Sequence, residues 1–173
     1  MSKLNLYEYI ETIEDFPRKG ILFRDISPLL ENNLAFMSLI SKMITYTKNY
    51  KIDIVAGLDA RGFLFSTILA YKLKLGSLMI RKLNKLPGNL FKQTYSLEYA
   101  NSALSLQKNR IIKNKNVLIV DDLLATGGTL KCAENLINKA GGYAMLSIVA
   151  IEIVSLKGRL KLNSDTFSIL QYD

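Results

Sequence analysis

Strand-like and helix-like segments alternate along most of this chain, and that alternation constrains its fold more than any other feature. Short β-branched runs, such as residues 52–57 and 116–121, predict buried strands. Apolar residues at helical spacing predict helices between them. The expected helices are 33–50, 63–73 and 126–140, and the expected strands are 52–57, 77–81, 116–121, 143–153 and an edge strand at 167–170. Such an order predicts an α/β fold with a mostly parallel central sheet flanked by helices.

Two regions interrupt this alternation. Near the start, Leu4, Tyr7, Ile10 and Ile13 recur at helical spacing and predict a short amphipathic helix. Residues 16–30 carry two prolines and a glycine and are expected to be irregular. In the middle, residues 94–99 and 103–107 alternate in polarity and predict an antiparallel excursion.

Composition narrows the class of protein. A chain of 173 residues fits one domain, and its net charge of +8 comes from scattered lysines. That charge is compatible with a solvated surface, a phosphorylated substrate or nucleic acid. The chain has no histidine, which excludes Ser-His triads and most zinc sites. The single cysteine, Cys132, is typical of a reducing compartment.

No membrane or targeting segment is expected. The longest nearly apolar stretch, 143–156, contains Glu152 and is shorter than the ~20 residues of a spanning helix. The acidic N-terminus lacks the apolar run of a secretion signal. A cytoplasmic protein is therefore expected.

The segment 117–130, VLIVDDLLATGGTL, is the most informative. An apolar strand leads into Asp121 and Asp122, and a glycine-containing loop then opens a helix. Such a loop can hold a phosphate, because glycines allow close backbone approach and the helix start offers N–H groups. Thr126 and Thr129 add hydroxyl donors, and the two carboxylates suit ribose hydroxyls or a nearby metal.

Other interpretations of this segment remain open. A Walker B strand would need a GxxxxGK[ST] loop, which the chain lacks. The glycines could form an ordinary turn with Thr126 as helix N-cap, and the aspartates could be solvated. Polar clusters also follow two other strands, at 57–61 and at Arg81-Lys82, and the ends of parallel strands meet at one edge. This convergence favours a ligand site.

Segment 117–130 resembles the phosphoribosyl-pyrophosphate (PRPP) signature of the type I phosphoribosyltransferases. Further stretches are similar to the adenine phosphoribosyltransferases, in order and spacing, over nearly the whole chain: 16–30, 56–65, 80–88, 95–100, 152–159 and the closing FSILQYD. The resemblance implies one domain, residues 1–173. Within it, an N-terminal helix and adenine-binding hood (1–32) would precede a core (33–173) that carries a flexible-loop excursion.

The resemblance also implies a reaction, namely transfer of 5-phosphoribosyl from PRPP to N9 of adenine, which yields AMP and pyrophosphate in purine salvage. It implies that Asp121 and Asp122 bind ribose and that the phosphate is held by Ala125, Thr126, Gly127, Gly128 and Thr129. The residues implied for pyrophosphate are Asp59, Ala60, Arg61, Arg81, Lys82 and Lys85. Mg²⁺ is expected to be held mainly by PRPP, near Asp121 and Asp122, without direct protein ligands.

Base recognition and proton transfer follow from the same resemblance. Glu98 is expected to lie on a mobile loop and to handle proton transfer at N7 or N9 of adenine. Tyr95 and Tyr99 are expected to help this loop to close. The expected adenine contacts are Leu22, Phe23, Arg24, Leu123 and Ile153. Ala125 stands where enzymes for 6-oxopurines tend to carry an acid, which favours adenine.

Further expectations concern positions that depart from the family pattern and the partners of the chain. The family typically has a cis peptide at Asp59–Ala60, and Ala60 replaces a serine of some relatives. Ala100 replaces a frequent glycine, which restricts the loop backbone. A homodimer is expected, with Arg81 and Lys82 near the interface. Two alternatives remain, a PRPP- or nucleotide-sensing regulator that binds RNA, and a phosphoribosyltransferase for orotate or a 6-oxopurine. Nucleic acid and membranes are not expected partners under the main interpretation.

Overall fold

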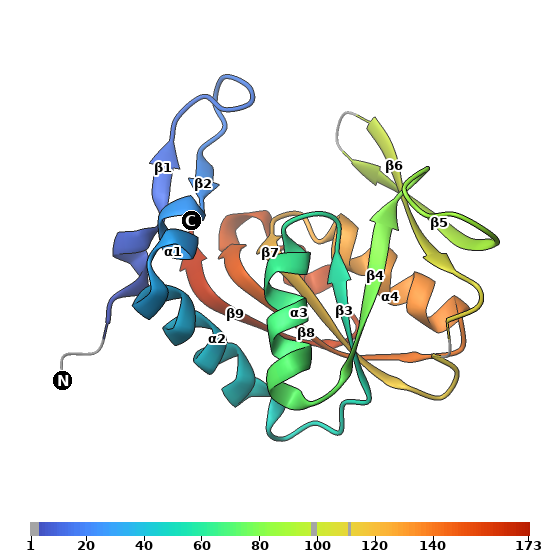
Figure 1. Ribbon diagram of the computed structural model, residues 1–173. Helices are drawn as coiled ribbons and strands as arrows, with labels where there is room; N and C mark the ends of the chain where they lie inside the picture. Colours follow the sequence, from blue (N-terminus) through green and yellow to red (C-terminus); the bar gives the residue numbers. More distant parts are fainter. Residues whose placement is uncertain (1–3, 98–99, 111) are drawn as a thin grey trace. The chain divides into compact units, whose positions relative to one another are not determined.

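The computed structural model describes residues 4–97, 100–110 and 112–173 (Figure 1). Within these ranges, side chains are described for all residues except those in the segment 95–102. The chain divides into two compact units, Met1–Lys42 and Met43–Asp173. Within the described residues, no helix is both long enough and apolar enough to cross a bilayer.

The first unit is built from short elements. They are the 3₁₀-helix η1 (Leu6–Tyr9), strands β1 (Glu11–Ile13) and β2 (Phe23–Asp25), and helix α1 (Ser27–Glu31). The two strands pair antiparallel, with Thr12 opposite Arg24. The prediction of an opening amphipathic helix is therefore wrong beyond one 3₁₀ turn, because Ile13 belongs to a strand instead. The stretch expected to be irregular contains β2 and most of α1, and Pro28 lies at the start of α1, where its missing N–H is tolerated.

Helix α2 (Asn33–Thr47) follows, and the second unit contains a seven-stranded sheet of order β5-β6-β4-β3-β7-β8-β9. The strands β3, β4, β7, β8 and β9 run parallel. Helix α3 packs on β3 and β7, and α4 packs on β7 and β8 from the other face of the sheet (Figure 1). The bounds are β3 Ile54–Leu58, α3 Gly62–Leu73, β4 Gly76–Lys82, β7 Asn116–Leu124, α4 Gly128–Lys139, β8 Tyr143–Ile153 and β9 Asp165–Tyr172. The predicted mostly parallel α/β sheet is confirmed.

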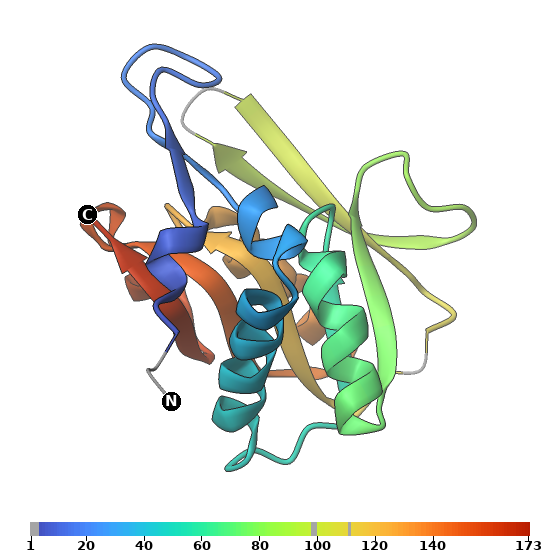
Figure 2. The same cartoon turned by 60° about the vertical axis from the view of Figure 1, so that its left-hand side comes forward.

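A hairpin of β5 (Leu90–Leu97) and β6 (Ala100–Gln107) forms the predicted antiparallel excursion. It joins the sheet where β6 pairs with the end of β4, with Arg81 opposite Ser105. Figure 2 shows the hairpin extending away from the rest of the sheet. Both strands start earlier than the sequence indicated.

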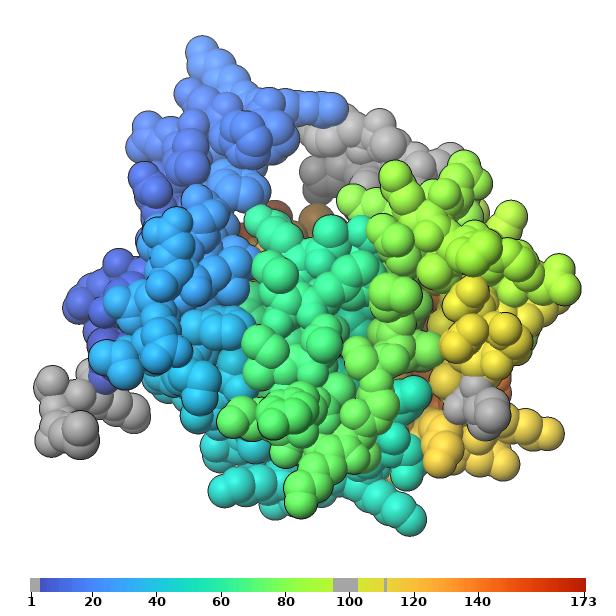
Figure 3. Space-filling model, viewed as in Figure 1, coloured from blue at the N-terminus to red at the C-terminus, as the bar shows by residue number. Residues whose placement is uncertain are grey.

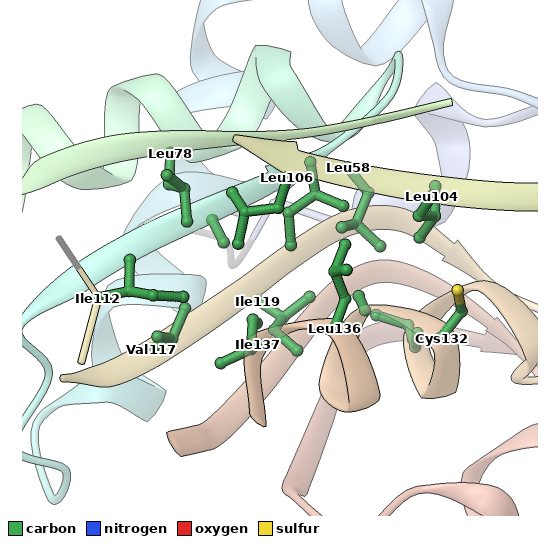
Figure 4. Close-up of a cluster of buried hydrophobic side chains, with 14 of the residues drawn as sticks. Leu58, Leu78, Leu104, Leu106, Ile112, Val117, Ile119, Cys132, Leu136 and Ile137 are labelled. Atoms are coloured by element: carbon green, nitrogen blue, oxygen red, sulfur yellow. The ribbon is translucent and has the colours of Figure 1, made fainter. Parts of the chain in front are cut away.

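One cluster of buried hydrophobic side chains lies between the sheet and α4 (Figure 4). Leu58, Leu104 and Ile119 of the sheet meet Leu136 and Cys132 of α4, and all five are buried. This cluster faces one side of β3 and β7, so it holds the ends of both strands in fixed positions next to the site described below.

Candidate active site

A cavity of about 460 Å³ lies at the carboxyl ends of β3, β4 and β7, as expected for a parallel sheet. Most of the residues predicted to bind PRPP line it. These are Asp59, Ala60, Arg61, Lys82, Asp121, Asp122, Ala125, Thr126, Gly127, Gly128 and Thr129. Leu123, which was predicted to contact adenine, lines the cavity as well. Three segments far apart in the sequence therefore contribute to one cavity.

The loop between β7 and α4, residues 125–127, carries the features of an anion site. Strand β7 extends to Leu124, so the two aspartates lie inside the strand rather than after it. Gly127, with φ of 78°, is the N-cap of α4 and provides no side-chain cap. Thr126 is therefore not the cap, contrary to that interpretation. The first N–H groups of a helix have no partner within it, so this helix start can donate hydrogen bonds to a phosphate.

The two adjacent aspartates are both buried, at 9% and 6% exposure for Asp121 and Asp122. The backbone N–H of Asp122 donates to Oδ1 of Asp121 at 2.9 Å. A carboxylate oxygen of Asp122 lies 2.8 Å from Nη2 of Arg61. These contacts tie the diacid to the loop after β3.

Burial raises the pKa of Asp121 well above its ordinary value, and the neighbouring Asp122 raises it further. Burial also raises the pKa of Asp122, although the positive charge of Arg61 opposes the change. Both carboxyls therefore lack some of the stabilisation that water gives to an ionised group. They can regain it by accepting hydrogen bonds from a polyhydroxylated ligand.

At the end of β3, the peptide bond between Asp59 and Ala60 is cis, as the resemblance implied. Oδ2 of Asp59 accepts from Nε of Arg81 at 3.0 Å and from the backbone N–H of Lys82 at 3.4 Å. Arg81 also donates to the carbonyl of Lys85 at 3.3 Å. Arg81 and Lys85 are not among the described residues that line the cavity, and Arg81 instead fixes Asp59 and the turn after β4.

The sequence did not indicate three further lining residues, Leu104, Leu124 and Leu130. The alternation of β6 could have placed Leu104 on the inner face. Glu98 and Tyr99 lie outside the described residues, as does the side chain of Tyr95. Ile153 is half-buried at the end of β8, and Leu22, Phe23 and Arg24 belong to the first unit. There the ring of Phe23 packs edge-on against Phe16 at 5.1 Å.

The donor set of the cavity fits a Mg²⁺ ion held mainly by its ligand. Among the described residues, no cluster of three or more acidic, cysteine or histidine side chains could hold a metal. Asp121 and Asp122 provide two buried carboxylates beside the cavity, and one of them already pairs with Arg61. Mg²⁺ commonly keeps waters and substrate phosphates as ligands, so this arrangement is compatible with it.

Comparisons with known proteins agree with this geometry. Residues 27–166 match the family model described as "Phosphoribosyl transferase domain". The adenine phosphoribosyltransferase of Halothermothrix orenii is 45% identical over 169 residues, which cover 97% of this chain and 99% of that protein. The chain belongs to the adenine phosphoribosyltransferase family.

Solved structures of adenine phosphoribosyltransferases have the same fold. The enzyme from Thermoanaerobacter pseudethanolicus superposes with a TM-score of 0.93 at 39% identity, covering 97% of this chain and 100% of that one. The Saccharomyces cerevisiae enzyme, solved with an imino-altritol bisphosphate and adenine, gives 0.91 at 38% identity, covering 95% and 96%. The resemblance deduced from the motifs is thus confirmed over nearly the full chain.

Proposed function

We propose that this chain transfers the 5-phosphoribosyl group of PRPP to N9 of adenine, forming AMP and pyrophosphate. The observation that carries the proposal is the single cavity that unites the 125–129 loop, the buried diacid and the Asp59–Arg61 turn. These groups match the three anionic or polar parts of PRPP, namely the 5-phosphate, the ribose hydroxyls and the pyrophosphate.

In the reaction, the bond from ribose C1 to the pyrophosphate oxygen breaks and a bond from C1 to N9 forms. The N9 proton of adenine leaves, and the pyrophosphate departs with its electron pair. Arg61 and Lys82 line the cavity and can neutralise charge that grows on the leaving pyrophosphate. Such contacts accelerate the reaction only if they are stronger in the transition state than in the ground state.

Mg²⁺ is proposed as the cofactor. When bound to PRPP it would supply positive charge at the leaving group. Asp121 and Asp122 would orient the ribose hydroxyls, with any contact to the ion passing through water or substrate oxygens. The start of α4, together with Thr126 and Thr129, would hold the 5-phosphate in place.

Adenine is proposed to contact Leu22, Phe23, Arg24, Leu123 and Ile153, as the resemblance implies. The choice of adenine is supported by Ala125, which lines the cavity and carries no acid to bind N7 of a 6-oxopurine. Strand β2 pairs with β1 along one edge, so its other edge faces away from that small sheet. A strand edge offers backbone donors and acceptors that can read a purine edge.

The test is pyrophosphate release with PRPP and each of adenine, hypoxanthine, guanine and orotate. We expect turnover with adenine alone, dependent on Mg²⁺. Turnover with another base, and none with adenine, would contradict the proposal.

Glu98→Ala should lower kcat far more than adenine affinity, because Glu98 is proposed to act on the proton rather than to bind the base. Equal losses in both would remove that role.

A homodimer is also proposed, through a surface on α3 and β4 that faces the viewer in Figure 3. Leu64, Tyr71 and Met79 expose 46%, 79% and 52% of their surface there. Exposed apolar patches of this kind mark interaction sites. On the same two elements, the Arg81 guanidinium lies over the Phe63 ring, 5.8 Å from its centroid. Light scattering should give a dimer for the native chain and a monomer for Met79→Lys, with Tyr143→Lys as an exposed control. A native monomer would refute the dimer, and a dimeric Met79→Lys would refute the surface.

A cytoplasmic location is proposed from the single buried thiol, Cys132.

A further inference from the structure

The connection between β8 and β9, residues 154–164, lies directly against the 125–127 loop. It contains η2 (Val154–Leu156) and η3 (Gly158–Lys161). A Cβ atom added to Gly158 would lie 2.1 Å from the carbonyl oxygen of Ala125 and 2.7 Å from the nitrogen of Gly127. A Cβ added to Gly127 would in turn lie 2.3 Å from the carbonyl oxygen of Gly158. The two backbones are therefore in direct contact, and neither glycine can gain a side chain unless one segment moves.

The middle of this connection is fixed to the sheet by an ion pair between the partly exposed Arg159 and the buried carboxylate of Glu152. Arg159 donates from Nε to Oε1 of Glu152 at 3.0 Å, and its Nη2 contacts the other oxygen of the same carboxylate. Arg159 also donates to the hydroxyl of Ser168 at 3.1 Å and to the carbonyl of Thr166. Glu152 is only 4% exposed. The residue next to Gly158 is thus held by strands β8 and β9 together.

The C-terminal end of the connection is fixed to helix α4. Glu134, which is fully buried, accepts from the backbone N–H groups of Asn163 at 3.1 Å and Ser164 at 2.8 Å. The hydroxyl of Ser164 donates to the same carboxylate at 2.7 Å, and Lys131 lies 3.2 Å from it. Glu134 lies on helix α4, whose first turn lines the cavity. This anchor therefore ties the connection to the helix proposed to bind the phosphate.

Both anchoring carboxylates are charged and well satisfied. Burial opposes ionisation of Glu152, but hydrogen bonds from Arg159 and Ser168 outweigh it and lower the pKa. The pKa of Glu134 is likewise lowered, because bonds from Ser164, Asn163 and Lys131 outweigh burial. A carboxylate that accepts this many bonds in fixed directions is a rigid support.

We infer that the 154–164 connection is a positioning element for the phosphate loop, with Gly158 as its contact and Glu152, Arg159 and Glu134 as its positioning residues. An anion site made of backbone N–H groups binds well only if those groups already point at the phosphate. The loop around Gly127 has no side-chain cap to fix it, so the neighbouring backbone at Gly158 serves that purpose. The inference rests on the proposed function, since it takes the loop to bind the 5-phosphate.

The experiment compares the affinities for AMP and adenosine, which differ only in the 5-phosphate, by calorimetry. In Gly158→Ala, AMP binding should weaken about tenfold or more, because displacement of a binding group by an ångström has effects of that size. Adenosine binding should not change. Gly76→Ala is the matched control, because its added Cβ would meet nothing nearer than 3.9 Å, and it should bind both ligands like the native chain.

A second variant keeps the test decisive if Gly158→Ala does not fold. Arg159→Lys retains the charge but loses the forked pairing with Glu152. The affinity for AMP should fall by a smaller factor, and the affinity for adenosine should again be unchanged. The inference is overturned if either variant keeps the native AMP affinity, or if the affinities for AMP and adenosine fall equally. A native chain that neither prefers AMP to adenosine nor releases pyrophosphate from PRPP and adenine would instead refute the proposed function.

Discussion

Two pairs of buried carboxylates in the second unit differ in the direction of their pKa shifts. Asp121 and Asp122, in the cavity, have raised pKa values. Glu134 and Glu152, behind the cavity, have lowered ones. All four residues are at most 9% exposed, so burial alone does not account for the difference.

The difference comes from the donors that each carboxylate receives. Glu134 and Glu152 accept from backbone N–H groups, hydroxyls and cationic side chains that fold around them. The bond described for Asp121 comes from the adjacent backbone N–H, and the Asp122 neighbour adds like charge. The cavity acids are thus left for a ligand to satisfy, whereas the glutamates are satisfied by the fold.

The largest expected effect is a loss of activity on substitution of a cavity aspartate. Asp122→Asn should lower kcat/KM for PRPP about hundredfold, since hydrogen bonds to a charged acceptor contribute about 1.5–3 kcal/mol. The thermal unfolding temperature of this variant should be unchanged or slightly higher, because the variant removes a poorly solvated charge. Asp53→Asn, whose carboxylate accepts from the backbone of Asn116 outside the cavity lining, should keep full activity. A destabilised but active Asp122→Asn would reverse the comparison.

Substitution of a glutamate behind the cavity should affect stability more than substitution of a cavity aspartate does. Glu134→Gln should lower the free energy of unfolding by about 2 kcal/mol, because an amide faces the same N–H donors with only one acceptor atom. Urea denaturation measures this loss, and the exposed Glu14→Gln is the surface control. If Glu134→Gln were as stable as the native chain, its carboxylate would not be the support described above.

The stability of the protein should depend on pH in opposite directions through the two kinds of carboxyl. The lowered pKa of Glu134 means that its contribution is present above the ordinary carboxyl pKa and is lost as pH falls through the folded value. The raised pKa of Asp121 means the reverse, since stability is lost as pH rises from the ordinary value through the folded one.

Urea denaturation between pH 3 and pH 8 on the native chain, Asp121→Asn and Glu134→Gln would measure both trends. Glu134→Gln should approach the native stability in acid, whereas Asp121→Asn should gain on it as pH rises. Parallel curves for all three proteins would show that neither carboxyl is shifted.

The smallest effects test individual donors to Glu152. Ser168 donates to it at 2.6 Å, and Gln171 reaches it at 3.4 Å. Ser168→Ala should therefore lower the free energy of unfolding by about 1 kcal/mol, and Gln171→Ala by less than about 0.5 kcal/mol. Thermal or urea unfolding of the two variants gives the ranking, and the opposite ranking would contradict the geometry.

The sequence predicted the sheet well because its signals are local. The apolar run before Asp121 and the helical spacing after Gly128 each indicate one element, and the alternation of elements then determines the architecture. The opening segment was predicted wrongly because a long-range contact decides it. Residues Glu11–Ile13 pair with Phe23–Asp25, and helical spacing carries no information on such pairing.

In the candidate site, motifs identified the residues that line the cavity but gave no role to those behind them. Arg159 belongs to the family-like stretch 152–159, and Glu134 looks in the sequence like an ordinary helix charge. Their supporting contacts emerge only when α4 and β9 meet the β8–β9 connection. Likewise, no local pattern indicates that Arg81 turns to Asp59 instead of the cavity. Glu98 stays a prediction, since it lies outside the described residues.

The ion pair between Arg61 and Asp122, 2.8 Å apart, has a consequence for how the two halves of PRPP cooperate. If pyrophosphate binds Arg61, as proposed, it should draw the guanidinium from Asp122 and leave that carboxylate available to the ribose. We therefore expect pyrophosphate to tighten the binding of ribose 5-phosphate, and ribose 5-phosphate to tighten that of pyrophosphate by the same factor. Titration of each ligand with and without the other measures this factor, and a value of one would show that the pair does not link the two ends.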